Sequence, residues 1–211
     1  MARARLHHVF AAVLLAALTG TPVVAHAGAH DRGLVVLLSK IHGDPTPAEL
    51  AHFGPDLSTK LESIANDPSV IRLARVRAIA CLGRSKTDAA FALAKRFATD
   101  PDGEYRLRVA AVWTLGHDFP ARPETLVILQ TVLRATDPGL RTAAVRALAR
   151  IGSPAALSML SMQRVAERNL EVRTALRAAA LKTLPTGARL PREGRRLRPV
   201  LSVHASSGGA R

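Results

Sequence analysis

The chain has 211 residues, of which 48% are hydrophobic but only 3% aromatic, so Ala, Leu and Val supply most of its apolar surface. This length accommodates one domain with its own core, and the Ala and Leu content favours packed helices over a β-sheet. The formal charge of +14, from 30 Lys and Arg against 16 Asp and Glu, excludes an acidic protein and suits anionic partners. Because a coding bias also produces an excess of arginine and alanine, charge alone does not establish such a partner.

Residues 1–27 have the three features of an export signal, in the right order. A basic start with Arg3 and Arg5 precedes an apolar run of ten residues, Val9–Leu18. This run is too short for the ~20 residues that a membrane-spanning helix needs. Ala25-His26-Ala27 then supplies the small-x-small pattern that signal peptidase cleaves. We therefore expect an exported protein, periplasmic or secreted, with no transmembrane segment in the mature chain.

Cleavage after Ala27 would create an amino terminus that can bind a metal ion. The new start, Gly28-Ala29-His30, offers an amine, backbone amide nitrogens and an imidazole, a square of nitrogens that suits Cu(II) or Ni(II). Two simpler outcomes compete with this site. Either His30 is a solvated residue near a frayed end, or cleavage falls after Ala29 and removes the site. No other cofactor is expected.

Residues 28–56 are expected to form a helical cap, with short helices over Leu34–Ile41 and Pro47–Phe53. A repeated motif then follows at a spacing of 33, 33 and 32 residues. Its copies are Arg75-Val-Arg-Ala-Ile-Ala-Cys-Leu-Gly83, Arg108-Val-Ala-Ala-Val-Trp-Thr-Leu-Gly116, Arg141-Thr-Ala-Ala-Val-Arg-Ala-Leu-Ala149 and Arg173-Thr-Ala-Leu-Arg-Ala-Ala-Ala-Leu181. Such self-similarity indicates a stack of supersecondary units.

Each copy is predicted to lie on the second helix of a helical pair. Apolar residues recur at spacing three, for example Val76, Ile79 and Leu82, so they form a buried stripe. Asp-Pro steps precede three copies, where Pro ends one helix and Asp can cap the next. Proline is likewise expected in the first turn of two first helices, at Pro123 and Pro154. The pairs are predicted at 57–66 with 70–83, 87–98 with 104–116, 122–135 with 139–151, and 154–168 with 170–184.

Residues 57–184 resemble the short HEAT-like repeats, of the kind also found in bilin lyases. The resemblance rests on the Asp-Pro turn, the following Arg and the Ala-rich second helix that ends in Leu-Gly. It implies an all-α protein, an α-α superhelix (HEAT-like solenoid) of about four helix pairs whose second helices line the concave face. It also implies a ladder of ion pairs between the turn aspartates and the second-helix arginines: Asp67, Asp100 and Asp137 with Arg75, Arg108 and Arg141, and Arg173 opposite Asn169.

The second helices contain the candidate partner-binding residues. Arg146, Arg150, Arg173 and Arg177 would give the concave face a basic lining, although a solvated helix face explains them equally well. Trp113 is an aromatic anchor of the kind found in binding hot spots. Its helical spacing with Val109 and Gly116 favours core packing as the alternative. Cys81, the only cysteine, can form no disulfide within the chain and is predicted to occupy a small core position, against the alternative of a free reactive thiol.

Residues 185–211 differ in composition from the repeats and predict a disordered, Arg-rich tail. Such a tail can bind polyanions through counterion release, or it can be an uninvolved extension. The candidate polyanion-binding residues are Arg189, Arg192, Arg195, Arg196 and Arg198.

These features predict a non-enzymatic scaffold that binds an unidentified protein or peptide. No histidine pair with an intervening carboxylate, cysteine pair or glycine-rich phosphate loop points to catalysis. The alternative is an envelope protein that binds a polyanion: acidic polysaccharide, an anionic membrane surface or nucleic acid. An enzyme or enzyme subunit is suggested by the bilin-lyase resemblance alone, which is an argument from fold.

Overall fold

The computed structural model describes residues 30–183, which form ten α-helices and no β-strand. The helices are α1 (Arg32–Ser39), α2 (Pro47–Ala51), α3 (Leu57–Asn66), α4 (Arg72–Gly83), α5 (Asp88–Thr99), α6 (Tyr105–Asp118), α7 (Pro123–Val132), α8 (Pro138–Ile151), α9 (Pro154–Ala166) and α10 (Leu170–Thr183). The predicted all-α fold is confirmed. All four helix pairs are present, from α3–α4 to α9–α10.

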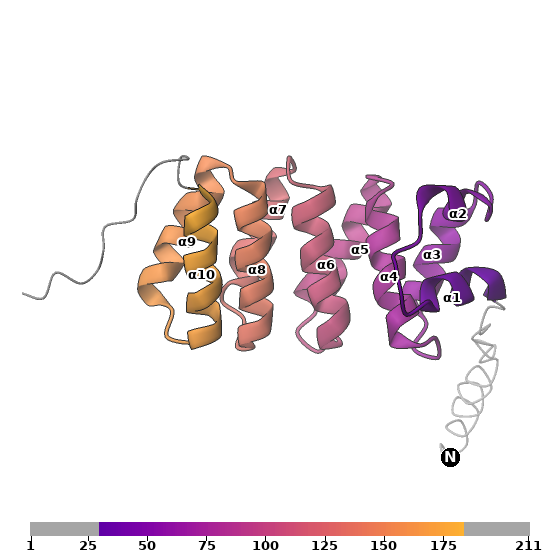
Figure 1. Ribbon diagram of the computed structural model, residues 1–211, viewed down its shortest axis with the longest axis horizontal. Helices are drawn as coiled ribbons and strands as arrows, with labels where there is room; N and C mark the ends of the chain where they lie inside the picture. Colours follow the sequence, from indigo (N-terminus) through magenta and orange to yellow (C-terminus); the bar gives the residue numbers. More distant parts are fainter. Residues whose placement is uncertain (1–29, 184–211) are drawn as a thin grey trace, which may run out of the picture.

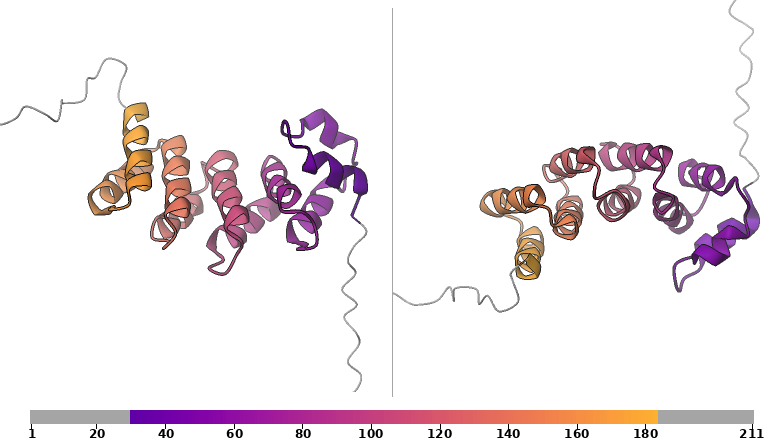
Figure 2. Two further views of the ribbon diagram at one scale, coloured as in Figure 1. Left: turned by 60° about the horizontal axis from the view of Figure 1, so that its bottom comes forward. Right: turned by 90° about the horizontal axis from the view of Figure 1, so that it is seen from above.

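The pairs stack into a solenoid with two rows of helices. In Figure 1 the second helices α4, α6, α8 and α10 stand side by side in front of the first helices α3, α5, α7 and α9. Contacts between neighbouring second helices hold the front row together. At the amino-terminal end of this row, α1 packs against α4. Seen from above, the stack is an arch whose inner row consists of the second helices (Figure 2).

Small residues allow the second helices to approach closely. Ala78, Ala111 and Ala144, which occupy one position of the repeat, are fully buried. At the position of Gly116, a Cβ would lie 2.6 Å from the Cβ of Ala147 on the next second helix. A larger side chain there would push α6 and α8 apart, since real carbon atoms do not approach so closely.

Prolines and capping residues begin the helices as predicted in the later repeats. Pro123 and Pro154 are the first residues of α7 and α9. Asp137 caps α8, where its Oδ1 accepts the N–H of Leu140 at 2.9 Å. In the earlier repeats, Asp67 and Asp100 precede α4 and α6 by several residues. Their carboxylates accept backbone N–H groups inside the turn, so they cap the turn rather than the helix.

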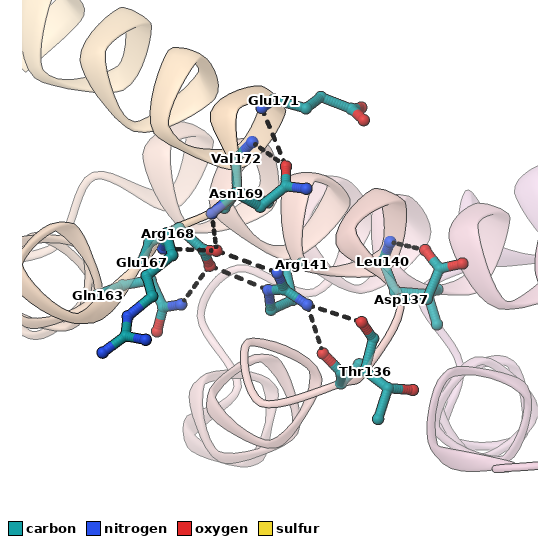
Figure 3. Close-up of polar contacts among 11 residues, drawn as sticks. Thr136, Asp137, Leu140, Arg141, Gln163, Glu167, Arg168, Asn169, Glu171 and Val172 are labelled. Atoms are coloured by element: carbon teal, nitrogen blue, oxygen red, sulfur yellow. Dashed lines mark hydrogen bonds and ion pairs between the residues drawn. The ribbon is translucent and has the colours of Figure 1, made fainter.

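An ion pair between the third and fourth repeats joins the two rows (Figure 3). Arg141 on α8 donates from Nε and Nη2 to the two carboxylate oxygens of Glu167, both at 3.0 Å. Its Nη1 donates to the backbone oxygens of Ala135 and Thr136. Glu167 also accepts bonds from Gln163 and from two backbone N–H groups. These contacts, with that of Arg141 first, lower the pKa of Glu167 to about 2.

Among the described residues, only two of the four arginines expected in the ladder, Arg75 and Arg141, form ion pairs between repeats, and their acidic partners are not the turn aspartates. Arg75 reaches Glu104 of the next repeat at 3.1 Å, as Arg141 reaches Glu167. Arg108 donates to the backbone oxygen of Pro101. The aspartates of the turns form no ion pair with these arginines, because turn N–H groups and a helix N-terminus occupy their carboxylates.

Cys81 is buried on α4, 5% exposed, which confirms the predicted core position. Burial raises the pKa of its thiol to about 11.

Within residues 30–183, no helix combines the length and the apolar character that crossing a bilayer requires.

Candidate partner-binding groove

A groove of about 1070 Å³ runs along the inner face of the arch, over α6, α8 and α10. Alanines from α8 and α10 make most of its floor: Ala143, Ala147, Ala149, Ala175, Ala178 and Ala179. Its other lining residues are Val109 and Trp113 on α6, Arg146 and Arg150 on α8, and Asn169, Leu170, Glu171 and Thr174 on or beside α10. Three second helices of successive repeats and the residue just before α10 therefore shape the groove.

Trp113 forms the wall of the groove on the α6 side. Its side chain is 45% exposed, so the interpretation of Trp113 as a core residue is wrong. The indole stacks on the imidazole of His117, one turn further along α6, with ring centroids 4.4 Å apart and planes inclined by 13°. Helical spacing with Val109 suggested burial, but Val109 itself is only partly buried at this edge of the core.

Asp118 holds His117 in place. The Oδ1 of Asp118 lies 2.7 Å from Nδ1 of His117, and the aspartate side chain is only 4% exposed. Its other oxygen, Oδ2, has no hydrogen-bond partner among residues 30–183. A hydrogen bond to a buried group is electrostatically stronger than one in water, so the contact with Oδ1 favours this orientation of the imidazole. Asp118, His117 and Trp113 thus form a continuous chain from the interior to the groove.

Gly83 on α4 makes room for this chain. A Cβ at Gly83 would lie 2.3 Å from Cγ2 of Thr114 and 2.6 Å from Oδ2 of Asp118. The close approach of α4 and α6 therefore requires glycine at this position. The repeated Leu-Gly that ends the motif accordingly serves packing between second helices.

Arg146 and Arg150 lie along α8 on the groove side. Both are exposed, and neither forms a hydrogen bond or ion pair with any described residue. Arg146 follows Trp113 by 33 residues and Arg150 follows His117 by 33, so each pair occupies equivalent positions in neighbouring repeats. Successive repeats therefore present an aromatic pair and then a cationic pair to the same face.

The other predicted site residues lie elsewhere. Arg173 and Arg177 are exposed on α10 but do not line the groove. The tail arginines, from Arg189 to Arg198, fall outside residues 30–183.

His30 is held by Asp67, with 2.6 Å between Nε2 and Oδ2, and its side chain is only 14% exposed. This burial contradicts the interpretation of His30 as a solvated residue. Hydrogen bonds from Ser69, and then from His30, lower the pKa of Asp67 to about 2. Gly28 and Ala29, the rest of the predicted metal site, lie outside the described residues. Within those residues, no group of three or more His, Cys, Asp or Glu side chains is placed to hold a metal ion.

Two features of the groove were missed by sequence reasoning. From the sequence, no role is predicted for the alanines of the floor, nor for His117 and Asp118. An alignment of the motif copies would have indicated His117, because His117 then aligns with Arg150. The burial of Asp118 could not be found this way, since it depends on the space beside Gly83.

Stacked helix pairs with an inner row of second helices define an α-solenoid. A family model of HEAT repeats matches residues 100–182, the part that builds the groove. The chain is a HEAT-like repeat protein. No curated protein and no solved structure matches it.

Proposed function

We propose that the chain is a non-enzymatic scaffold that binds a protein or peptide partner in the groove of α6, α8 and α10. The observation that carries the proposal is an exposed Trp113, stacked on His117, beside Arg146 and Arg150, which have no ion-pair partner among residues 30–183, over an alanine floor. Tryptophan and arginine are the residue types that contribute most to binding at protein interfaces. Side chains already held in one orientation lose less entropy on binding, which raises affinity.

Capture from cell-envelope extract on the immobilised protein tests this proposal when a groove variant is run beside it. The groove variant is Arg146→Glu/Arg150→Glu. Its matched control is Arg134→Glu/Arg164→Glu, which makes the same charge change at exposed arginines that do not line the groove. A partner kept by wild type and control but lost with the groove variant supports the proposal. A partner kept equally by all three proteins would show that the groove is not the binding surface.

A polyanion partner is the second candidate, and the distribution of charge favours it. Residues 134–181 contain eight arginines against three acidic residues. Of these arginines, only Arg141 forms an ion pair among the described residues. Binding to a polyanion should fall steeply with added salt and should weaken similarly in the groove and control variants. Binding in the groove should depend on Arg146 and Arg150 far more than on Arg134 and Arg164.

We also propose that the protein is exported and loses residues 1–27. The proposal rests on the basic, apolar and small-x-small regions in sequence. The intact mass of the protein recovered outside the cytoplasm would locate the cleavage site. If the chain starts at Gly28, a visible absorbance on adding Cu(II) would test the predicted metal site at His30. A chain that starts at Met1 would rule out the export signal, and one that starts at His30 would rule out the metal site.

A further inference from the structure

The chemistry of the groove indicates what kind of peptide fits it, an inference that rests on the proposed function. Its floor consists of alanines on α8 and α10, so no large side chain keeps a partner at a distance. Small residues at a helix surface allow another backbone to approach closely. Such a floor can accommodate a partner segment whose own larger side chains project onto it.

The backbone of the groove has no hydrogen bonds to offer a partner. The walls are helices, whose interior N–H and C=O groups bond within the helix. The exposed N-terminus of α10 is also occupied, because Oδ1 of Asn169 accepts the N–H groups of Glu171 and Val172 (Figure 3). An extended peptide would bury backbone groups without partners, whereas an α-helix satisfies its own. These constraints favour a helical occupant over an extended one.

The charged residues of the groove favour acidic side chains on that helix. Arg146 and Arg150 are one helical turn apart, which corresponds to a rise of ~6 Å along α8. Acidic residues one turn apart on an antiparallel or parallel partner helix match this spacing. Glu171 stands in the first turn of α10, where the groove meets the start of that helix, and disfavours a third acid beside it.

We propose that the groove binds an amphipathic α-helix whose apolar ridge packs on the alanine floor and on Trp113. Two acidic residues one turn apart on its edge pair with Arg146 and Arg150, and a basic or neutral residue faces Glu171. The charge order fixes the direction in which the helix lies. The same pattern excludes basic amphipathic helices, which Arg146 and Arg150 repel.

Selection from a displayed library of random 16-residue peptides on the immobilised protein tests the proposal. The chain contains a single tryptophan, so the fluorescence of Trp113 reports binding of selected, Trp-free peptides directly. The expected peptides carry apolar residues at helical spacing and an acidic pair at i and i+4. Their affinity should fall about tenfold or more with Arg146→Glu/Arg150→Glu, remain unchanged with Arg134→Glu/Arg164→Glu, and rise with Glu171→Lys for peptides rich in acids.

Two altered versions of a selected peptide separate the parts of the proposal. Replacing both acids by glutamine should weaken binding as the groove variant does, and the two changes should not add when combined. A central proline should abolish binding because it breaks the helix.

Selected peptides that depend on Trp113 and the groove arginines but lack acids, or that tolerate proline, would overturn this inference and leave the proposed function standing. Selection of no peptide, or only of peptides indifferent to the groove variant, would overturn both. Far-UV circular dichroism of each variant confirms that it is folded.

Discussion

Trp113 lies flat on His117 at the edge of the groove, with ring centroids 4.4 Å apart and planes only 13° from parallel. The imidazole is itself fixed by Asp118, so the orientation of an exposed side chain depends on a buried carboxylate. Exposed side chains normally sample several rotamers. Here the stack on a fixed imidazole favours one orientation of the indole, which would lower the entropy cost of binding on that surface.

Replacing His117 by alanine should release the indole. We expect Trp113 fluorescence to lose anisotropy and to become more accessible to acrylamide, while the helical circular dichroism remains. The protein should also lose about 1–3 kcal/mol of unfolding free energy, because the buried Asp118 loses its partner.

Two further variants separate these effects. In His117→Ala/Asp118→Asn, the unpaired charge is removed, so stability should recover in part while the indole stays loose. In His117→Phe, a flat ring remains beneath Trp113, so anisotropy should be retained. Unchanged anisotropy in His117→Ala would show that stacking does not orient Trp113.

Gly83→Ala should destabilise the protein by about 1–3 kcal/mol, because the added Cβ overlaps Thr114 and Asp118. Chemical denaturation measures the loss, and Trp113 anisotropy should fall as Asp118 is displaced. Gly33→Ala on α1 is the matched control, since its nearest contacts are 3.2 and 3.4 Å away at side-chain atoms. Thr114→Ser removes the methyl group that overlaps and should partly rescue Gly83→Ala. Equal effects of the two glycine substitutions would argue against a special role for Gly83.

The fold was predictable because its determinants are periodic and local. The repeated motif placed the second helices within a few residues, and prolines such as Pro123 and Pro154 marked first turns where the structure has them. These signals act within one helical turn of the residue concerned, so a short stretch of sequence is enough to recognise them. The all-α solenoid follows from repeating such units.

The contacts between repeats were less predictable because they depend on the length of each turn. Asp67 and Asp100 stand eight residues before Arg75 and Arg108, and Asp137 stands four before Arg141. Backbone N–H groups of the longer turns bond the carboxylates of Asp67 and Asp100, and Asp137 caps α8. Arg75 and Arg141 therefore pair with Glu104 and Glu167 instead, whereas Arg108 donates to the backbone oxygen of Pro101. The position of Trp113 was also not predictable from local spacing. Its spacing along α6 is typical of a core residue, but the side chain is exposed and lines the groove.

Cys81 should resist alkylation in the native protein. A pKa of about 11, against the ordinary 9.0, leaves about a hundredfold less thiolate at pH 8, and burial hinders the reagent further. Iodoacetamide labelling followed by mass spectrometry measures the rate, with the unfolded protein in guanidinium as reference. Because the chain has one cysteine, every adduct reports this site. Labelling of the native protein at the unfolded rate would contradict the buried position.

Glu167→Gln should destabilise the solenoid at neutral pH, because it removes the charge that pairs with Arg141. In the folded protein the pKa of Glu167 is about 2, against an ordinary value of 4.5, so the folded chain binds its proton less tightly than the unfolded chain. The stabilisation is therefore complete above about pH 4.5 and is lost as the pH falls through about 2. With both side chains largely buried, 15% exposed for Arg141 and 4% for Glu167, we expect a loss of about 2 kcal/mol at pH 7.

Urea denaturation of wild type and Glu167→Gln across this pH range measures that difference. It should be constant from pH 7 to about pH 5 and then shrink toward pH 2, because protonation makes the wild-type side chain neutral like glutamine. Glu62→Gln on α3 is the control, since Glu62 is exposed and forms no ion pair with a described residue. It should shift stability by less than about 0.5 kcal/mol at any pH. A difference for Glu167→Gln that persists unchanged at pH 2 would mean that glutamine disturbs packing at the junction of α8 and α9, and that the ion pair is not the source of the stability.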